Sequence, residues 1–179
     1  FMKRIFLLIC FLIFGIAQAQ EASQTEDRYG VSAGVIGVWG FYEKAITKDF
    51  SLHSQVGYHG GFMMGTDSKL DYVFTTSIRV EPRYYYNFSK RASKDKNTSN
   101  NAGNYVALEL SYVPNLLTSS NREGIEVSKS LYLIPKYGLR RNISSVVSFE
   151  FAFGIGYAWG EHNVNGTAVA LDLRFDFNL

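Results

Sequence analysis

The feature that most constrains the fold is an alternation of side-chain character from Val146 to Leu179. One parity is aromatic or aliphatic: Phe149, Phe151, Phe153, Ile155, Tyr157 and Trp159, then, after a polar break at 161–166, Val169, Leu171, Leu173, Phe175 and Phe177. The other parity is small or charged: Ala152, Gly154, Gly156 and Ala158, then Asp172, Arg174 and Asp176. Successive side chains of a β-strand point to opposite faces. The stretch therefore predicts a β-hairpin with one apolar face and one small or charged face.

The same period-two pattern recurs in four other segments, at 50–62, 72–88, 105–114 and 130–140, with polar connections between them. An apolar, glycine-rich segment at 29–46 reads as a further strand, which brings the count to seven. Antiparallel closure of a bacterial barrel requires an even number of strands. We therefore expect eight, with two of them inside residues 20–46. The alternative is seven strands with a parallel first and last pair.

These strands predict an all-β fold, an antiparallel up-and-down transmembrane β-barrel. No apolar run approaches the roughly 18 residues of a membrane-spanning helix. A soluble lipocalin-like barrel has the same alternation with the faces exchanged. The polar parity here is rich in small residues, which suit the narrow interior of an eight-stranded barrel, and the apolar parity ends in aromatic residues. Both features favour the membrane barrel.

The N-terminus has the pattern of a secretory signal peptide at residues 1–19. Lys3 and Arg4 precede an apolar stretch from Ile5 to Ile16, and residues 17–19 form an A-x-A cleavage site. We expect a flexible lead-in at 20–28 and the barrel domain at 29–179, exported to the outer membrane of a Gram-negative-type cell. Cys10 follows an isoleucine, which argues against a lipoprotein signal. The mature chain then lacks cysteine and so lacks disulfides and thiolate metal sites.

Charge excludes one class of partner. The chain has 18 Lys and Arg and 16 Asp and Glu, so removal of the segment that holds Lys3 and Arg4 leaves a formally neutral protein. Neutrality argues against nucleic-acid binding. We expect outer-membrane lipids and the barrel-assembly machinery as partners, a monomeric state and no cofactor, and the sequence indicates no specific partner.

Charged residues on the small parity are the candidate site. They are five of each sign: Arg79, Arg83, Lys136, Arg140 and Arg174, with Glu81, Glu109, Glu150, Asp172 and Asp176. Buried charges need partners, so the favoured reading is an ion-paired network that fills the lumen, with Glu81 as a hub. The alternative is the lining of a narrow channel or a proton path.

Catalytic and metal sites are not expected. Ser51, His53 and His59 share one face, but no carboxylate is evident beside them to complete a hydrolase site. His53 and His59 are about 20 Å apart along a strand, too far to share a metal. We therefore expect a non-enzymatic barrel with a structural or interaction role. A narrow solute channel and a lipid-modifying enzyme remain the alternatives.

Two further expectations concern the strand ends and the prolines. The C-terminus and the connections at 47–49, 89–104 and 141–145 should share one basic rim, whose acidic residues are Glu43, Asp49 and Asp95. The segment 89–104 is expected to be a solvated loop, and the alternative is a contact of this loop with anionic phospholipid or a periplasmic partner. We expect Pro114 at a strand end, and bulges at Pro82 and Pro135.

From Tyr72 onward the chain resembles a group of small, largely uncharacterised outer-membrane β-barrel proteins. The resemblance rests on residues 81–87 (EPRYYYN), 96–101 (KNTSNN), 103–105 (GNY) and 137–142 (YGLRRN). It implies an outer-membrane barrel of about the size of OmpA or OmpX, with no implied activity, ligand or catalytic residue. The terminal Phe177-Asn178-Leu179 departs from the aromatic ending usual in such barrels.

Overall fold

The computed structural model describes residues 25–64, 70–121, 127–161 and 165–179. The predicted signal peptide and residues 20–24 of the predicted lead-in lie outside the described residues. The described elements are β1 (Arg28–Gly34), β2 (Gly37–Thr47), β3 (Phe50–Met64), β4 (Leu70–Tyr84), α2 (Phe88–Ala92), the 3-10 turn η1 (Ser99–Asn101), β5 (Asn104–Val113), β6 (Ser119–Ser120), β7 (Ser130–Asn142), β8 (Val147–Gly160) and β9 (Gly166–Asn178). Among the described helices, none is long and apolar enough to cross a membrane.

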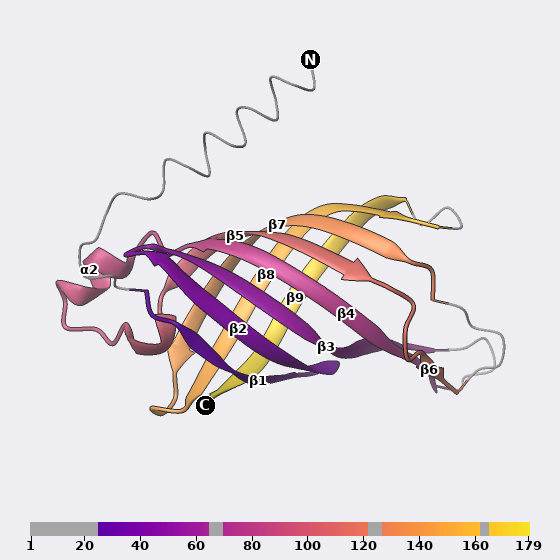
Figure 1. The fold of residues 1–179 in the computed structure, drawn as a ribbon, viewed down its shortest axis with the longest axis horizontal. Helices are drawn as coiled ribbons and strands as arrows, with labels where there is room; N and C mark the ends of the chain where they lie inside the picture. The colour runs from indigo at the N-terminus through magenta and orange to yellow at the C-terminus, as the bar shows by residue number, and fades with distance from the viewer. Residues whose placement is uncertain (1–24, 65–69, 122–126, 162–164) are drawn as a thin grey trace, which may run out of the picture.

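The strands close into a single antiparallel barrel (Figure 1). Neighbours follow the order β3-β2-β1-β9-β8-β7-β5-β4, and pairing of β3 with β4 completes the ring, while the two-residue β6 adds to one end of β4. Eight long strands therefore form the wall, which confirms the all-β barrel. The segment expected to hold two strands does so, as β1 and β2 joined by a turn at Val35 and Ile36.

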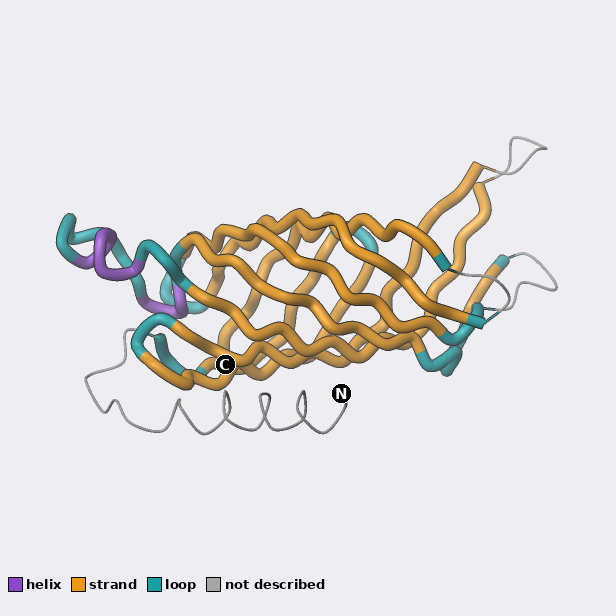
Figure 2. Tube along the Cα trace, turned by 90° about the horizontal axis from the view of Figure 1, so that it is seen from above, coloured by secondary structure: helices purple, strands orange, loops and turns teal. Residues whose placement is uncertain are grey.

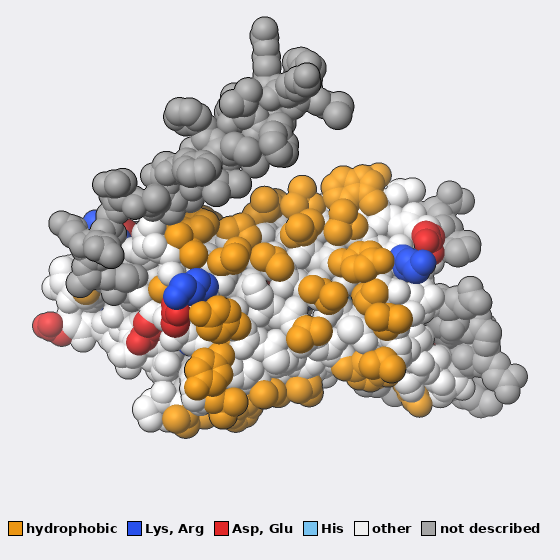
Figure 3. All heavy atoms as spheres, viewed as in Figure 1, with side chains coloured by type: hydrophobic (Ala, Val, Ile, Leu, Met, Phe, Trp, Pro, Cys, Tyr) orange, Lys and Arg blue, Asp and Glu red, His pale blue; other side chains and the backbone are white. Residues whose placement is uncertain are grey.

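The alternation separates the two faces of the wall as predicted. Outward residues are large and apolar, such as Phe153, Leu133 and Trp159, which are 48%, 37% and 44% exposed. Inward residues of the same strands, such as Ala152 and Ala158, are buried. Hydrophobic side chains consequently spread over the whole barrel surface seen in Figure 3.

The strand ladders correct the expectation for two prolines. Pro82 and Pro135 interrupt the ladder from β4 to β5 and from β7 to β8, but the register is the same on both sides of each gap. No residue is inserted, so the predicted bulges are wrong: the missing proline N–H removes ladder bonds without shifting the strands. The described register shift lies instead between Ala45 and Thr47. Pro114 directly follows β5, as predicted.

One end of the barrel is covered by the connection after β4. The C-terminus, α2 and two tight turns lie together there (Figure 2). The connection expected as a solvated loop at 89–104 contains most of α2 and all of η1, and its Asn101 is fully buried. Phe88, expected at the end of a strand, is instead the first residue of α2 and is also fully buried. Phe88 stacks on Tyr85 with ring centroids 4.5 Å apart. Burial of this aromatic pair is the physical reason that the segment is ordered.

The prediction of a flexible lead-in is wrong for residues 25–28, the part of this segment that the structure describes. Arg28 already belongs to β1, and Thr25 is 2% exposed. The Thr25 backbone N–H donates to the Lys48 carbonyl at 3.1 Å, and the Glu26 N–H donates to Asn101 Oδ1 at 2.8 Å. Residues 25–28 are thus packed against the rim, because these backbone donors find partners on the adjacent turns.

Candidate functional site: an ionic network in the lumen

The ten charged residues predicted to point inward all do so. Nine have residue exposures of 8% or less, and the tenth, Asp172, has a side chain that is 10% exposed. The structure adds Arg28 and Glu43, which are 3% and 0% exposed. Sequence reasoning placed Arg28 in the lead-in and Glu43 on the rim. Alternation did not show that Glu43 points inward, because the inward positions of β2 before it are occupied by Trp39 and Phe41. On the other strands, by contrast, the inward positions hold mainly small or charged residues.

Glu150 on β8 is the centre of the half nearer α2. Its carboxylate accepts from Arg83 Nη1 at 3.0 Å and from Nη2 at 3.2 Å. Arg140 and Arg174 also donate to it, from β7 and β9. Three guanidinium groups from three strands therefore meet one fully buried carboxylate.

Glu43 and Asp176 neutralise the arginines on the other side of this cluster. Arg140 Nη1 lies 2.9 Å from Glu43 Oε2, and the Tyr85 hydroxyl donates to Glu43 Oε1 at 2.7 Å. Arg28 Nη2 lies 2.8 Å from Asp176 Oδ2. The Arg140–Glu43 contact joins β7 to β2, which are not ladder neighbours, whereas the Arg28–Asp176 contact reinforces the pairing of β1 with β9.

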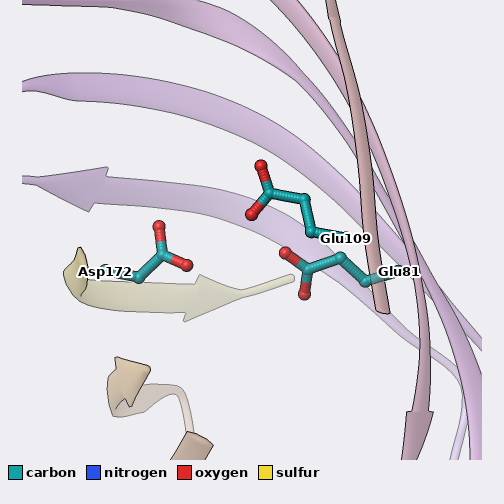
Figure 4. Close-up of side chains that lie close together, drawn as sticks. All are labelled: Glu81, Glu109 and Asp172. Carbon is teal, nitrogen blue, oxygen red and sulfur yellow. The ribbon is translucent and has the colours of Figure 1, made fainter. Parts of the chain in front are cut away.

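Lys136 organises the second half. Its ammonium lies 2.5 Å from Glu81, 2.9 Å from Glu109 and 2.5 Å from Asp172. Figure 4 shows these three carboxylates converging from different strands. One oxygen from each carboxylate lies within 4.8 Å of one oxygen of each of the others, a spacing compatible with a metal ion. The Lys136 ammonium already supplies the central positive charge, so the arrangement is an internal salt bridge.

Arg79 and Arg83 connect the two halves through Glu81. Arg83 Nη2 lies 2.5 Å from Glu81 Oε2, and Arg79 Nη1 lies 3.7 Å from Glu81 Oε1. Arg79 also lies 3.0 Å from Asp172. Glu81 is therefore a shared partner of three cations, as expected from its position, although Glu150 binds three arginines more closely.

The full set contains six cations and six carboxylates. Arg28, Arg79, Arg83, Lys136, Arg140 and Arg174 face Glu43, Glu81, Glu109, Glu150, Asp172 and Asp176. The charges of these twelve described residues therefore sum to zero and are mutually paired. Such an arrangement fills space and braces strands, and within the described part of the lumen it leaves no unbalanced charge to attract an ion.

Ser51 and His53 contact the network and do not form a hydrolase site. The expectation that no carboxylate lies beside them is wrong, because Ser51 Oγ donates to Glu43 Oε1 at 2.6 Å and His53 Nδ1 lies 3.3 Å from Glu43 Oε2. A hydrolase site requires the serine hydroxyl to be hydrogen-bonded to the histidine that acts as its base. Here Ser51 donates its hydroxyl hydrogen to Glu43 and not to His53. Ser51 and His53 are both 0% exposed. Burial beside the arginines makes this group a part of the network.

A cavity of about 480 Å³ lies beyond the network, beside the β1–β2 turn at Val35 and Ile36. Its walls include Ile36, Trp39 and Ile134, with His59, Ser111 and Tyr132 as neutral polar groups. Arg79, Glu109, Asp172 and Arg174 also line it. The outermost charges of the network therefore form one side of a mostly apolar chamber, a feature that sequence alternation alone did not reveal.

Fold and site together define a small antiparallel β-barrel with a charge-paired interior. Comparisons with protein-family models, with curated proteins and with solved structures find no match to this chain.

Proposed function

We propose that this protein is an integral outer-membrane β-barrel with a closed, salt-bridged lumen, and that its role is structural or interaction-based and non-enzymatic. One observation carries the proposal: the polarity of the barrel is inverted relative to a soluble barrel. Large apolar side chains are exposed on the outside, whereas Arg83, Glu150 and other charges inside are 0% exposed. Lipid stabilises this arrangement, because barrel closure satisfies in hydrocarbon the backbone groups of the strand segments that are paired on both sides.

The rim nearer α2 supports the same proposal. The Tyr86 hydroxyl donates to the Tyr137 hydroxyl at 3.0 Å, and Asn104 Nδ2 donates to Tyr137 at 2.9 Å. Both tyrosines keep an exposed ring on the outer wall, 47% and 38% exposed. Tyrosines with an apolar ring and a hydrogen-bonded hydroxyl are typical of the interface between hydrocarbon and headgroups.

The paired lumen supports closure in preference to conduction. Arg83 reaches Glu150 and Arg140 reaches Glu43 across the interior, whereas Arg174 pairs with Glu150 on the adjacent strand. All three arginines are at most 1% exposed. An ion that passed would have to separate these pairs, at a cost of several kcal/mol for each uncompensated charge.

Single-channel recording in planar bilayers tests the proposal. The refolded protein should insert, resist carbonate extraction and give no stable conductance steps. The double variant Arg83→Ala with Glu150→Ala keeps the lumen neutral but removes bulk from its centre, and it should conduct. The matched control removes the exposed pair of Lys129 and Glu161, 3.7 Å apart, and should stay silent. Stable steps in the unsubstituted protein would contradict closure, and failure to insert would contradict the membrane assignment.

A further inference from the structure

The wall of the barrel is incomplete beside the cavity. β1 pairs with β9 as far as Gly34 and Arg174. β2 pairs with β3 as far as Gly37 and His59, and one further hydrogen bond runs from the Gly60 N–H to the Ile36 carbonyl at 3.0 Å. Beyond these points β9 continues to Gly166 and β3 continues to Met64. The short β1–β2 hairpin therefore leaves a notch between β9 and β3. Figures 1 and 2 show the strand hairpins separating at this end.

The notch lies at the depth of the apolar band. Tyr157 and Trp159 form an aromatic pair near the end of β8, and Tyr157 pairs with Thr167 on β9. From Thr167 to Arg174, β9 runs about 23 Å, or about 18 Å along the axis at a strand tilt of about 40°. The apolar band of such a barrel is about 25 Å tall. Residues paired across tilted strands are offset along the axis by about 3 Å per strand, so the hairpin turn ends about 10 Å below the level of Tyr157.

The residues around the notch have the chemistry of a lipid-facing opening. The hairpin turn is Val35-Ile36, with Val35 75% exposed, where turns in water normally carry Gly, Asn, Asp or Pro. Val169 and Leu171 on the free edge of β9 are 71% and 68% exposed. All four residues also line the cavity. The opening therefore leads sideways, from the apolar surroundings into the chamber.

The inner side of the cavity indicates which head group fits. Arg79 and Asp172 are 3.0 Å apart with side chains 10% exposed, so both a donor and an acceptor are presented. The four charged residues of the lining, Arg79, Arg174, Glu109 and Asp172, sum to zero, and a charged head would add an uncompensated charge. Trp39 Nε1 and His59 Nε2 have no hydrogen-bond partner among the described residues. An indole N–H is a donor only, so an oxygen acceptor suits this site.

We propose that the cavity binds an uncharged amphiphile, an aliphatic chain with a hydroxyl or carbonyl head, which enters through the notch from the membrane. The volume of about 480 Å³ lies within the range of small-molecule sites. The head sits against the Arg79–Asp172 pair, and the chain lies along Ile36, Ile134 and Leu171 toward the opening. This inference rests on the proposed membrane location.

The two tryptophans of the chain separate the two proposals. Trp39 lines the cavity and is 6% exposed, whereas Trp159 is 44% exposed on the outer wall. Trp159→Phe leaves Trp39 as the reporter of the cavity, and Trp39→Phe leaves Trp159 as the reporter of the bilayer. Each variant is refolded into vesicles of unbrominated lipid and titrated with 11-bromoundecanol, whose bromine quenches nearby indoles.

We expect saturable quenching of Trp39 that undecanol reverses, and non-saturable quenching of Trp159 in proportion to alcohol in the bilayer. Ala170→Phe fills the cavity and should weaken binding at least tenfold, while Ala168→Phe, inward on the same strand but outside the lining, should not. His59→Phe should weaken binding about tenfold through loss of one hydrogen bond, and His59→Gln should restore it. The bromo acid and the bromoalkyl trimethylammonium should bind more weakly than the alcohol.

Each outcome decides one proposal. Quenching of Trp39 that never saturates, or saturation unchanged by Ala170→Phe, would overturn the amphiphile site and leave the membrane assignment intact. Absence of Trp159 quenching in vesicles made with brominated phospholipid would overturn the membrane assignment itself. If Ala170→Phe does not refold, displacement by undecanol in the Trp159→Phe protein still decides the question.

Discussion

Replacement of Glu150 by glutamine is the sharpest test of the lumen network. The substitution keeps the size of the side chain and one acceptor oxygen, but it removes the charge that Arg83, Arg140 and Arg174 share. All three arginines are at most 1% exposed, so water does not replace the lost partner. Removal of one member of a buried ion pair costs about 3–5 kcal/mol.

That cost is large enough to measure in lipid vesicles by urea unfolding, followed by far-ultraviolet circular dichroism. At a denaturant slope of about 2 kcal/mol per molar, the unfolding midpoint should fall by about 2 M. The double variant Glu150→Gln with Arg174→Gln restores neutrality and should recover part of the loss. Glu161→Gln, in an ion pair about half exposed, should shift stability by less than about 1 kcal/mol.

A free energy of unfolding for Glu150→Gln within about 0.5 kcal/mol of that of the unsubstituted protein would contradict this role of Glu150. So would a double variant whose loss of stability equals the sum of the two single losses, because independent sites add and coupled sites do not. Either result would mean that the arginines find other partners and that Glu150 does not hold the network together.

Three further outcomes follow from the packing and from the rim. Gly138→Ala should destabilise by roughly 1–3 kcal/mol in urea unfolding because its Cβ would overlap the Tyr105 ring, whereas Gly61→Ala, with open space, should be nearly neutral. Phe88→Ala should cost about 3 kcal/mol and raise proteolysis of the α2 connection in limited digestion. Asp27→Asn should cost less than about 1 kcal/mol at neutral pH, and in a pH series this cost should vanish only as the pH falls through the lowered folded-state pKa of Asp27.

The sign of the Asp27 effect comes from its contact with Lys44. The Lys44 ammonium donates to Asp27 Oδ2 at 2.6 Å and holds the pKa of this carboxyl below its usual value. A lowered pKa in the folded state adds stability above the usual value near 4, and the gain is lost as the pH falls through the folded value. A loss of stability on raising the pH, specific to the unsubstituted protein, would contradict this sign.

The period-two alternation determined the most about this protein. The alternation distinguished inward from outward residues on the long strands. It predicted ten charged residues in the lumen, and all ten point inward in the structure. This success has a simple cause: strand geometry assigns the face of each residue locally, without reference to its neighbours. At 29–46 both parities are apolar and rich in glycine, so the alternation was weak there and Glu43 was placed on the rim. Arg28, just before this segment, was placed in the flexible lead-in.

Tertiary structure decided which charges meet and where the wall is open. Glu150 binds Arg83 from a strand 67 residues away, and alternation cannot specify such a partner because barrel closure sets the neighbours across the lumen. The notch likewise depends on how far β1 and β2 extend relative to β9 and β3, a difference in strand length read only from the ladders. The sequence thus determined the two faces of the barrel, and closure of the ring determined its network and its side opening.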